Sequence, residues 1–197
     1  MKIQFESTTA CNADCTFCPN HQMTRPKGEM SDDLFRKIVA DGMAIRRSFF
    51  VPFLNGEPFI FSRIWDWLDY LQEQRVKVHI YTNGEYMDVD RLLGYQNISC
   101  ICVSLNAATP ETHRAVMRGP HYYVVAPKLR DLLSKRRSGV FASMVIVERN
   151  QHEVKAFKKQ WGGNAIFGEF RNWAGALHDP IEKSGVQLIV HSQINSE

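Results

Sequence analysis

Long apolar runs are missing from this sequence, and none approaches the roughly 20 residues that a membrane-spanning helix requires. The first residues, MKIQFES, lack the charged and then apolar segments of a secretory signal peptide. The net charge of +3 is far too small to indicate a nucleic-acid partner. Repeats and linker-like tracts are also missing. We therefore expect a cytoplasmic protein that binds neither membranes nor nucleic acids.

Cysteine is scarce, with five residues in 197, and an odd number does not suit a full disulfide framework. Thiols stay reduced in a cytoplasm, which also disfavours a disulfide-stapled fold. Cys100 and Cys102 fit the usual behaviour of free cysteines as small buried side chains. The other three, Cys11, Cys15 and Cys18, lie together in the short stretch CNADCTFC.

Short runs rich in β-branched and aromatic residues alternate with stretches of helical periodicity along the whole chain. The expected strands are residues 2–7, 49–54, 76–82, 99–106, 140–148 and 165–173. Repeated strand–helix units indicate a parallel sheet with helices outside it, and six units are two short of a closed eight-stranded barrel. The sequence predicts an α/β fold, a partial (β/α)6 TIM-like barrel over residues 1–175. A short C-terminal tail, residues 176–197, follows without an auxiliary-cluster domain.

Capping residues mark the expected starts of three helices. Ser31 precedes an acidic first turn, and Thr109 is followed by Pro110, which suits the first helical position. Asn150 and Glu153 have the spacing of a capping box before the last helix. In a fold of this kind, ligands bind at the carboxyl ends of the strands, so we expect the functional residues in the loops that follow them.

The three clustered cysteines follow the first expected strand with the spacing C-x3-C-x2-C, so their thiolates can converge on one metal centre. Tetrahedral zinc would take a fourth protein ligand, and His21 is available for it. A [4Fe–4S] cluster held by three cysteines would instead leave one iron open. The spacing alone does not decide between these two centres.

The motif CNADCTFC, with Phe17 before the last cysteine, resembles the signature of the radical S-adenosylmethionine (radical SAM) superfamily. The resemblance implies the same partial barrel and a [4Fe–4S] cluster on Cys11, Cys15 and Cys18. It further implies that S-adenosylmethionine (SAM) binds the open iron through its amino and carboxylate groups. The members nearest in character carry SPASM-type extensions with further cysteines, which this sequence lacks after Cys102.

Three later segments extend the resemblance, although turn formation or a cation near a helix end would explain each of them as well. LNGEPFI is similar to the GGEP motif that binds the SAM ammonium group, with Asn55 in place of the first glycine. The other two segments are TNG at the third strand end, and the fourth strand with the helix and R-G that follow it. The resemblance implies SAM contacts for Phe17, Asn55, Gly56, Glu57, Pro58, Thr82, Asn83, Ser104, Asn106 and Arg118.

Side-chain alternation on the strands also nominates residues for a substrate pocket inside the barrel. These candidates are Glu6, Lys77, His79, Tyr81, Glu169, Arg171 and Trp173. By contrast, residues 25–30 are expected to connect the cysteine motif to the first helix without chemistry of their own.

The resemblance implies reductive cleavage of SAM to a 5′-deoxyadenosyl radical that abstracts hydrogen from a substrate. The required partners are an external one-electron donor, such as flavodoxin or ferredoxin, and a peptide, protein or sugar-like small molecule. A zinc- or iron–sulfur-binding module for interaction or electron transfer, without SAM chemistry, is the rival hypothesis.

Overall fold

The computed structural model describes residues 1–45, 48–136, 138–173 and 177. Within this part of the chain the strands are β1 (Lys2–Gln4), β2 (Phe49–Val51), β3 (Lys77–Thr82), β4 (Ile98–Ser104), β5 (Val140–Ile146) and β6 (Ala165–Glu169). They form one six-stranded sheet in the order β1-β2-β3-β4-β5-β6, and every neighbouring pair is parallel. The predicted α/β fold, a partial barrel with an open sheet, is confirmed.

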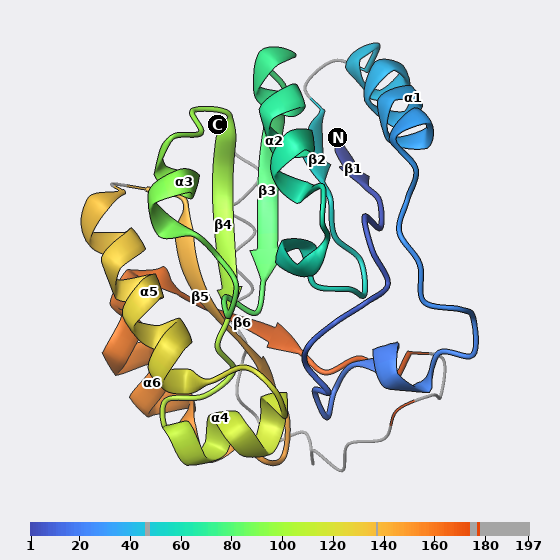
Figure 1. Cartoon of the computed structure of the whole chain (residues 1–197). Coiled ribbons are helices and arrows are strands. Elements are labelled where there is room, and N and C mark those ends of the chain that lie inside the picture. Colours follow the sequence, from blue (N-terminus) through green and yellow to red (C-terminus); the bar gives the residue numbers. More distant parts are fainter. Residues whose placement is uncertain (46–47, 137, 174–176, 178–197) are drawn as a thin grey trace.

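Helical segments fill the connections between the strands (Figure 1). The α-helices are α1 (Asp32–Met43), α2 (Ile64–Glu73), α3 (Val89–Leu93), α4 (Pro110–Met117), α5 (Tyr122–Lys135) and α6 (Val154–Trp161). Short 3-10 helices are η1 (Pro19–Gln22), η2 (Pro58–Ile60), η3 (Gln151–Glu153) and η4 (Gly162–Asn164). The strands run toward the end of the sheet where α4 and the segment after β1 lie (Figure 1). The described part of the chain contains no helix that is both long and apolar enough to span a membrane.

The hydrophobic core lies between one face of the sheet and the helices. Alternate residues of the strands, among them Phe50, Ile80 and Ile101, are fully buried there against apolar side chains of the helices. Phe35 of α1 and Trp67 of α2 stack with ring centroids 4.0 Å apart. Because the helices cover this face, the other face and the strand ends are left to form a site.

Two of the three predicted helix caps are confirmed. The Ser31 hydroxyl accepts a hydrogen bond from the Leu34 N–H at the start of α1, and the Thr109 hydroxyl accepts one from the Thr112 N–H at the start of α4. Each bond satisfies a backbone donor that has no partner within the helix.

The predicted capping box at Asn150 and Glu153 is wrong. The fully buried Asn150 side chain accepts from the Val147 N–H and donates to the carbonyl oxygens of Asn106 and Val145, at 2.8, 2.9 and 2.9 Å. The Glu153 carboxylate accepts from the N–H groups of Ala108 and Thr109. Both side chains therefore join the ends of β4 and β5 to the start of α4, and α6 begins only at Val154.

Strand parity was predicted correctly in the middle of the sheet and wrongly at its edge. The pairs His79–Cys100 and Tyr81–Cys102 alternate with the core residues, so they lie on the face away from the helices. Both cysteines are buried, as expected. Glu169, however, pairs with Ile146 of the hydrophobic core and so lies on the helix side of the sheet. Arg171 and Trp173 lie beyond the end of β6 and are exposed, so the strand alternation behind their prediction does not extend to them.

Candidate active site

The predicted metal ligands lie on the loop that follows β1, which we call the cysteine loop (residues 9–20). Its backbone is fixed to the end of α4: the Asp14 N–H donates to the Met117 carbonyl oxygen at 3.2 Å, and the Thr16 N–H to that of Val116 at 3.0 Å. A Cβ atom on Gly119 would collide with the Asn12 carbonyl group, so glycine permits this close approach.

The thiols of the cysteine loop influence one another. Burial raises the pKa of the Cys15 thiol well above its usual range, and the neighbouring Cys18 and Cys11 thiols raise it further. Burial likewise raises the pKa of Cys11 to about 11, and it raises the pKa of Cys18. Thiols held in this way become good ligands only when a metal centre stabilises their thiolates.

The described side chains do not form a ready site for a single zinc ion. In the described residues no group of three His, Cys, Asp or Glu side chains is close enough to hold a single metal ion. Zinc at about 2.3 Å from each thiolate would bring pairs of sulfur atoms to about 3.8 Å. A cluster of four irons spreads its ligands further apart. His21, the candidate fourth zinc ligand, instead has its Nδ1 3.1 Å from the Asp14 carboxylate.

The loop after β2, residues 55–58, packs directly on the cysteine loop. The Glu57 N–H donates to the Ala10 carbonyl oxygen at 2.8 Å. A Cβ atom on Gly56 would collide with the Thr8 carbonyl group, so this contact also needs glycine. Pro58 then begins η2.

The Glu57 carboxylate is buried and joins the ends of β2 and β3. It accepts hydrogen bonds from the Thr82 hydroxyl at 2.7 Å, the Asn83 N–H at 2.7 Å and the Phe59 N–H at 3.1 Å. Burial raises the pKa of Glu57 to about 7, and the three hydrogen bonds oppose that rise. These donors orient the carboxylate within the chain, and its contact with the SAM ammonium stays a prediction.

Asn83 connects the Glu57 carboxylate to the cysteine loop. Its Nδ2 donates to the Asn12 Oδ1 at 2.7 Å, and its own Oδ1 accepts from the Glu85 N–H at 3.1 Å. Asn12, which stands between the first two cysteines, was not among the predicted site residues. The structure therefore links Glu57, Asn83 and Asn12 into one hydrogen-bonded path.

Asn106 reaches the cysteines from the other side. It is buried in the left-handed backbone region (φ 57°), and its Nδ2 donates to the Met117 Sδ at 3.0 Å. That sulfur lies 3.6 Å from the Cys15 Sγ. Ser104 is half-buried, with its Oγ 3.4 Å from the Ser143 Oγ. Met117 was missed because a buried methionine on a helix looks like ordinary core.

Arg118 ends α4 in the left-handed backbone region (φ 50°, ψ 56°). Its half-exposed guanidinium lies 3.7 Å from the Asp14 carboxylate of the cysteine loop. Phe17 is half-buried in the same loop. Predicted residues from four separate segments thus meet around the cysteines, while Ser104 contacts the neighbouring strand.

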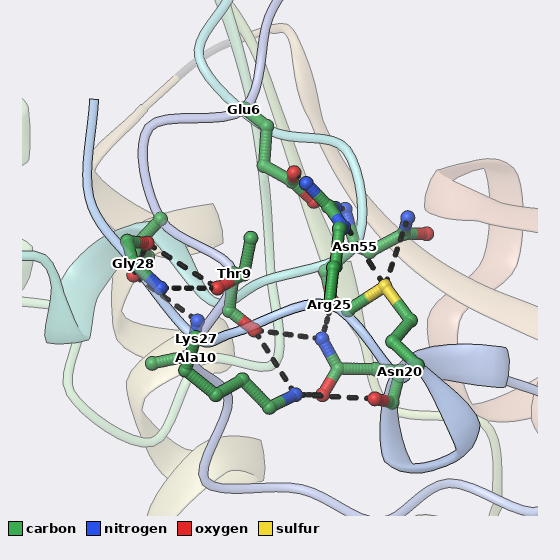
Figure 2. A network of polar contacts seen from close by, with 10 residues as sticks. Glu6, Thr9, Ala10, Asn20, Arg25, Lys27, Gly28 and Asn55 are labelled. Atoms are coloured by element: carbon green, nitrogen blue, oxygen red, sulfur yellow. Dashed lines mark hydrogen bonds and ion pairs between the residues drawn. The ribbon is translucent and has the colours of Figure 1, made fainter.

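The remaining pocket candidates lie along the sheet face away from the helices. Glu6 pairs with Arg25 and accepts from the Asn55 N–H at 3.3 Å (Figure 2). Lys77 is exposed. His79 stacks on Phe49 with centroids 4.0 Å apart, and burial lowers its pKa to about 4. Burial raises the pKa of Tyr81 to about 12.

Comparison with known proteins identifies the family. The profile described as the Radical SAM superfamily matches residues 5–160 of this chain. The chain belongs to the radical SAM superfamily. Enzymes of this superfamily use a [4Fe–4S] cluster and SAM, so the expected class and cofactors are confirmed.

Curated relatives are similar over most of this chain. The mycofactocin maturase MftC of Mycobacterium tuberculosis is 28% identical over 157 residues, which are 79% of this chain and 40% of the relative. The subtilosin biosynthesis protein AlbA of Bacillus subtilis is 26% identical over 172 residues, covering 80% of this chain and 38% of AlbA. A probable GTP 3′,8-cyclase of Methanothermobacter thermautotrophicus is 25% identical over 78% of this chain and 51% of its own length. The chain spans about half or less of these relatives.

Solved structures show the same fold. SuiB of Streptococcus suis bound to SAM superposes with a TM-score of 0.73 at 14% identity, over 89% of this chain and 42% of SuiB. The structure of native anSMEcpe with bound AdoMet gives a TM-score of 0.67 at 17% identity, over 86% of this chain and 52% of that one.

Proposed function

We propose that this chain is the catalytic core of a radical SAM enzyme that modifies a peptide. The observation that carries the proposal is the convergence of four segments on the cysteine loop. Backbone and side-chain hydrogen bonds connect that loop to residues 55–57, to Asn83 and to the end of α4.

Cys11, Cys15 and Cys18 would hold the [4Fe–4S] cluster, which, when bound, supplies the electron that cleaves SAM to methionine and a hydrogen-abstracting 5′-deoxyadenosyl radical. Glycine at position 56 lets residues 55–57 pack against the start of the cysteine loop, beside which the amino acid part of SAM would bind. Arg118 offers a cation there for its carboxylate. The sheet face away from the helices, which carries His79 and Tyr81, would bind the substrate, and Ser104 at the end of β4 would contact SAM.

A peptide substrate is favoured by the relatives. SuiB has been solved bound to the precursor peptide SuiA, at a TM-score of 0.70 to this chain. AlbA is described as a protein of bacteriocin biosynthesis. A small-molecule substrate is the competing outcome, because a probable GTP 3′,8-cyclase is also a relative. The electron would come from a flavodoxin or ferredoxin.

Anaerobic reconstitution tests the core of the proposal. We expect about four irons and sulfides per chain, a brown protein, and 5′-deoxyadenosine when SAM and dithionite are added. Cys15→Ala should lose the cluster and the product, whereas Cys100→Ala, a buried cysteine on the sheet, should retain both. A colourless protein with one zinc that depends on His21 would support the rival binding module. A brown protein without 5′-deoxyadenosine would indicate an electron carrier.

The substrate class has its own test. Peptides encoded beside the gene, synthesised with deuterium at carbon, should transfer the label to 5′-deoxyadenosine and increase its yield. Label transfer from a nucleotide or sugar, and none from the peptides, would contradict the peptide proposal but not the radical chemistry.

A further inference from the structure

The two ends of the cysteine loop are tied together by Asn20, which is buried. Its Nδ2 donates to the carbonyl oxygens of Thr9 at 2.8 Å and Asn55 at 2.9 Å (Figure 2). Thr9 lies two positions before the first cysteine of the loop, and Asn20 lies two positions after the last. The Asn20 side chain therefore closes the loop and attaches it to residues 55–58.

Lys27 completes this closure (Figure 2). Its Nζ lies 2.6 Å from the Asn20 Oδ1, 3.1 Å from the Asn20 carbonyl oxygen and 3.4 Å from the Thr9 carbonyl oxygen. An ammonium group has three hydrogens to donate, and here they meet acceptors from both ends of the loop. Although Lys27 is exposed as a residue, its charged end is held in one place.

The contacts of Lys27 do not neutralise its charge. Its hydrogen-bond partners are carbonyl and amide oxygens, and no described carboxylate lies within ion-pair distance of its Nζ. The charge lies beside the cysteines: the carbonyl oxygens that the Lys27 Nζ contacts belong to Thr9, two residues before Cys11, and to Asn20, two residues after Cys18.

We propose that Lys27 is a positioning residue for the cluster, which closes the cysteine loop with Asn20 and favours the reduced state by fixing a positive charge beside Cys11 and Cys18. The inference rests on the proposed function. Three thiolates make the cluster anionic, and one electron from the flavodoxin or ferredoxin donor adds a negative charge without breaking a bond. A fixed cation stabilises the product of that step more than the starting state.

The expected effect of Lys27 on cluster reduction can be calculated from electrostatics. A unit charge roughly 10 Å from a redox centre, at an effective dielectric constant near 20, changes a one-electron equilibrium constant by about tenfold. Solvent exposure of Lys27 weakens this electrostatic effect. Removal of the charge should therefore lower the equilibrium constant for reduction by about threefold to tenfold, or the midpoint potential by about 30 to 60 mV.

The experiment measures the midpoint potential of the reconstituted cluster by anaerobic spectroscopic titration. Lys27→Met removes the charge and the hydrogen bonds, Lys27→Gln removes the charge but keeps two N–H donors, and Lys27→Arg keeps the charge. Lys37→Met is the matched control, because Lys37 is exposed on α1 and pairs with Asp41 at 2.7 Å. Iron content is measured on each variant.

The proposal predicts lower potentials for Lys27→Met and Lys27→Gln, and near-normal potentials for Lys27→Arg and the control. The shift should shrink at high ionic strength. If Lys27→Met fails to fold or to assemble a cluster, Lys27→Gln decides. Normal potentials in the neutral variants with full iron content would overturn the inference while leaving the proposed function intact. A wild-type chain that assembles no [4Fe–4S] cluster would overturn both.

Discussion

Replacing Glu57 by glutamine should remove a pH dependence from the stability of the cluster-free chain. Burial raises the pKa of Glu57 from its usual 4.5 to about 7. The folded state therefore binds a proton more tightly than the unfolded state does. The stability due to this group is fully present below pH 4.5 and is lost as the pH rises through about 7.

The magnitude follows from the size of the pKa shift. Each pKa unit corresponds to about 1.4 kcal/mol, so a shift of roughly 2.5 units gives a loss of about 3 kcal/mol between pH 4.5 and pH 8. Glutamine cannot ionise, so it removes the pH dependence. Its NH2 group would, however, face a backbone donor, the N–H of Asn83 or Phe59, and this unsatisfied donor pair would cost about 1–3 kcal/mol of stability at every pH.

Urea unfolding of wild type and Glu57→Gln across this range measures the effect. Subtracting the two free energies of unfolding at each pH cancels the contributions of shared groups such as His79. The wild-type advantage should shrink by about 3 kcal/mol from pH 4.5 to pH 8. Glu73→Gln, at an exposed position of α2, should show no such trend. A difference that stays constant or grows with pH would refute the assignment of a raised pKa to Glu57.

Further predictions concern stability and cluster retention. Gly56→Ala should destabilise the chain by more than about 2 kcal/mol, because its Cβ would meet the Thr8 carbonyl group, whereas Gly163→Ala has open space and should cost about 1 kcal/mol or less; thermal unfolding compares them. Asn150→Ala removes three buried hydrogen bonds and should cost about 2–4 kcal/mol in urea unfolding, and no loss would show that the contacts contribute nothing. Met117→Ala should open a cavity beside Cys15 and speed cluster loss in air, measured by the decay of visible absorbance.

Local patterns in the sequence predicted the architecture well. Hydrophobic runs located all six strands, and proline explains part of the difference in their lengths: β2 stops at Val51 because Pro52 has no N–H for the ladder. The order β1 to β6 follows the general tendency of consecutive strands to be neighbours in the sheet. Side-chain orientation at the edge of the sheet was harder to predict, since alternation alone does not say which face of a strand carries Glu169.

The candidate site was predictable only where a motif marks it. The cysteines and the loop of Glu57 carry such motifs, and placement at strand ends brings them together. Asn20 and Lys27 were missed because they contact each other and backbone oxygens of a loop, and such contacts leave no pattern in the sequence. Asn150 and Glu153 were misassigned because the spacing of a capping box says nothing about more distant partners.

The attachment of the cysteine loop to the end of α4 also has a consequence during synthesis. Cys15 and Met117 are 102 positions apart, and the backbone hydrogen bonds beside them join residues that are similarly far apart in the sequence. A ribosome adds about 5–20 residues per second, so the cysteines emerge roughly 5–20 s before the segment that supports them. During that interval the three thiols lie on a segment without its later support, and any thiophilic metal can reach them. Under the proposed function, cluster loading would therefore have to wait until α4 is complete, because an earlier start would meet an unformed site.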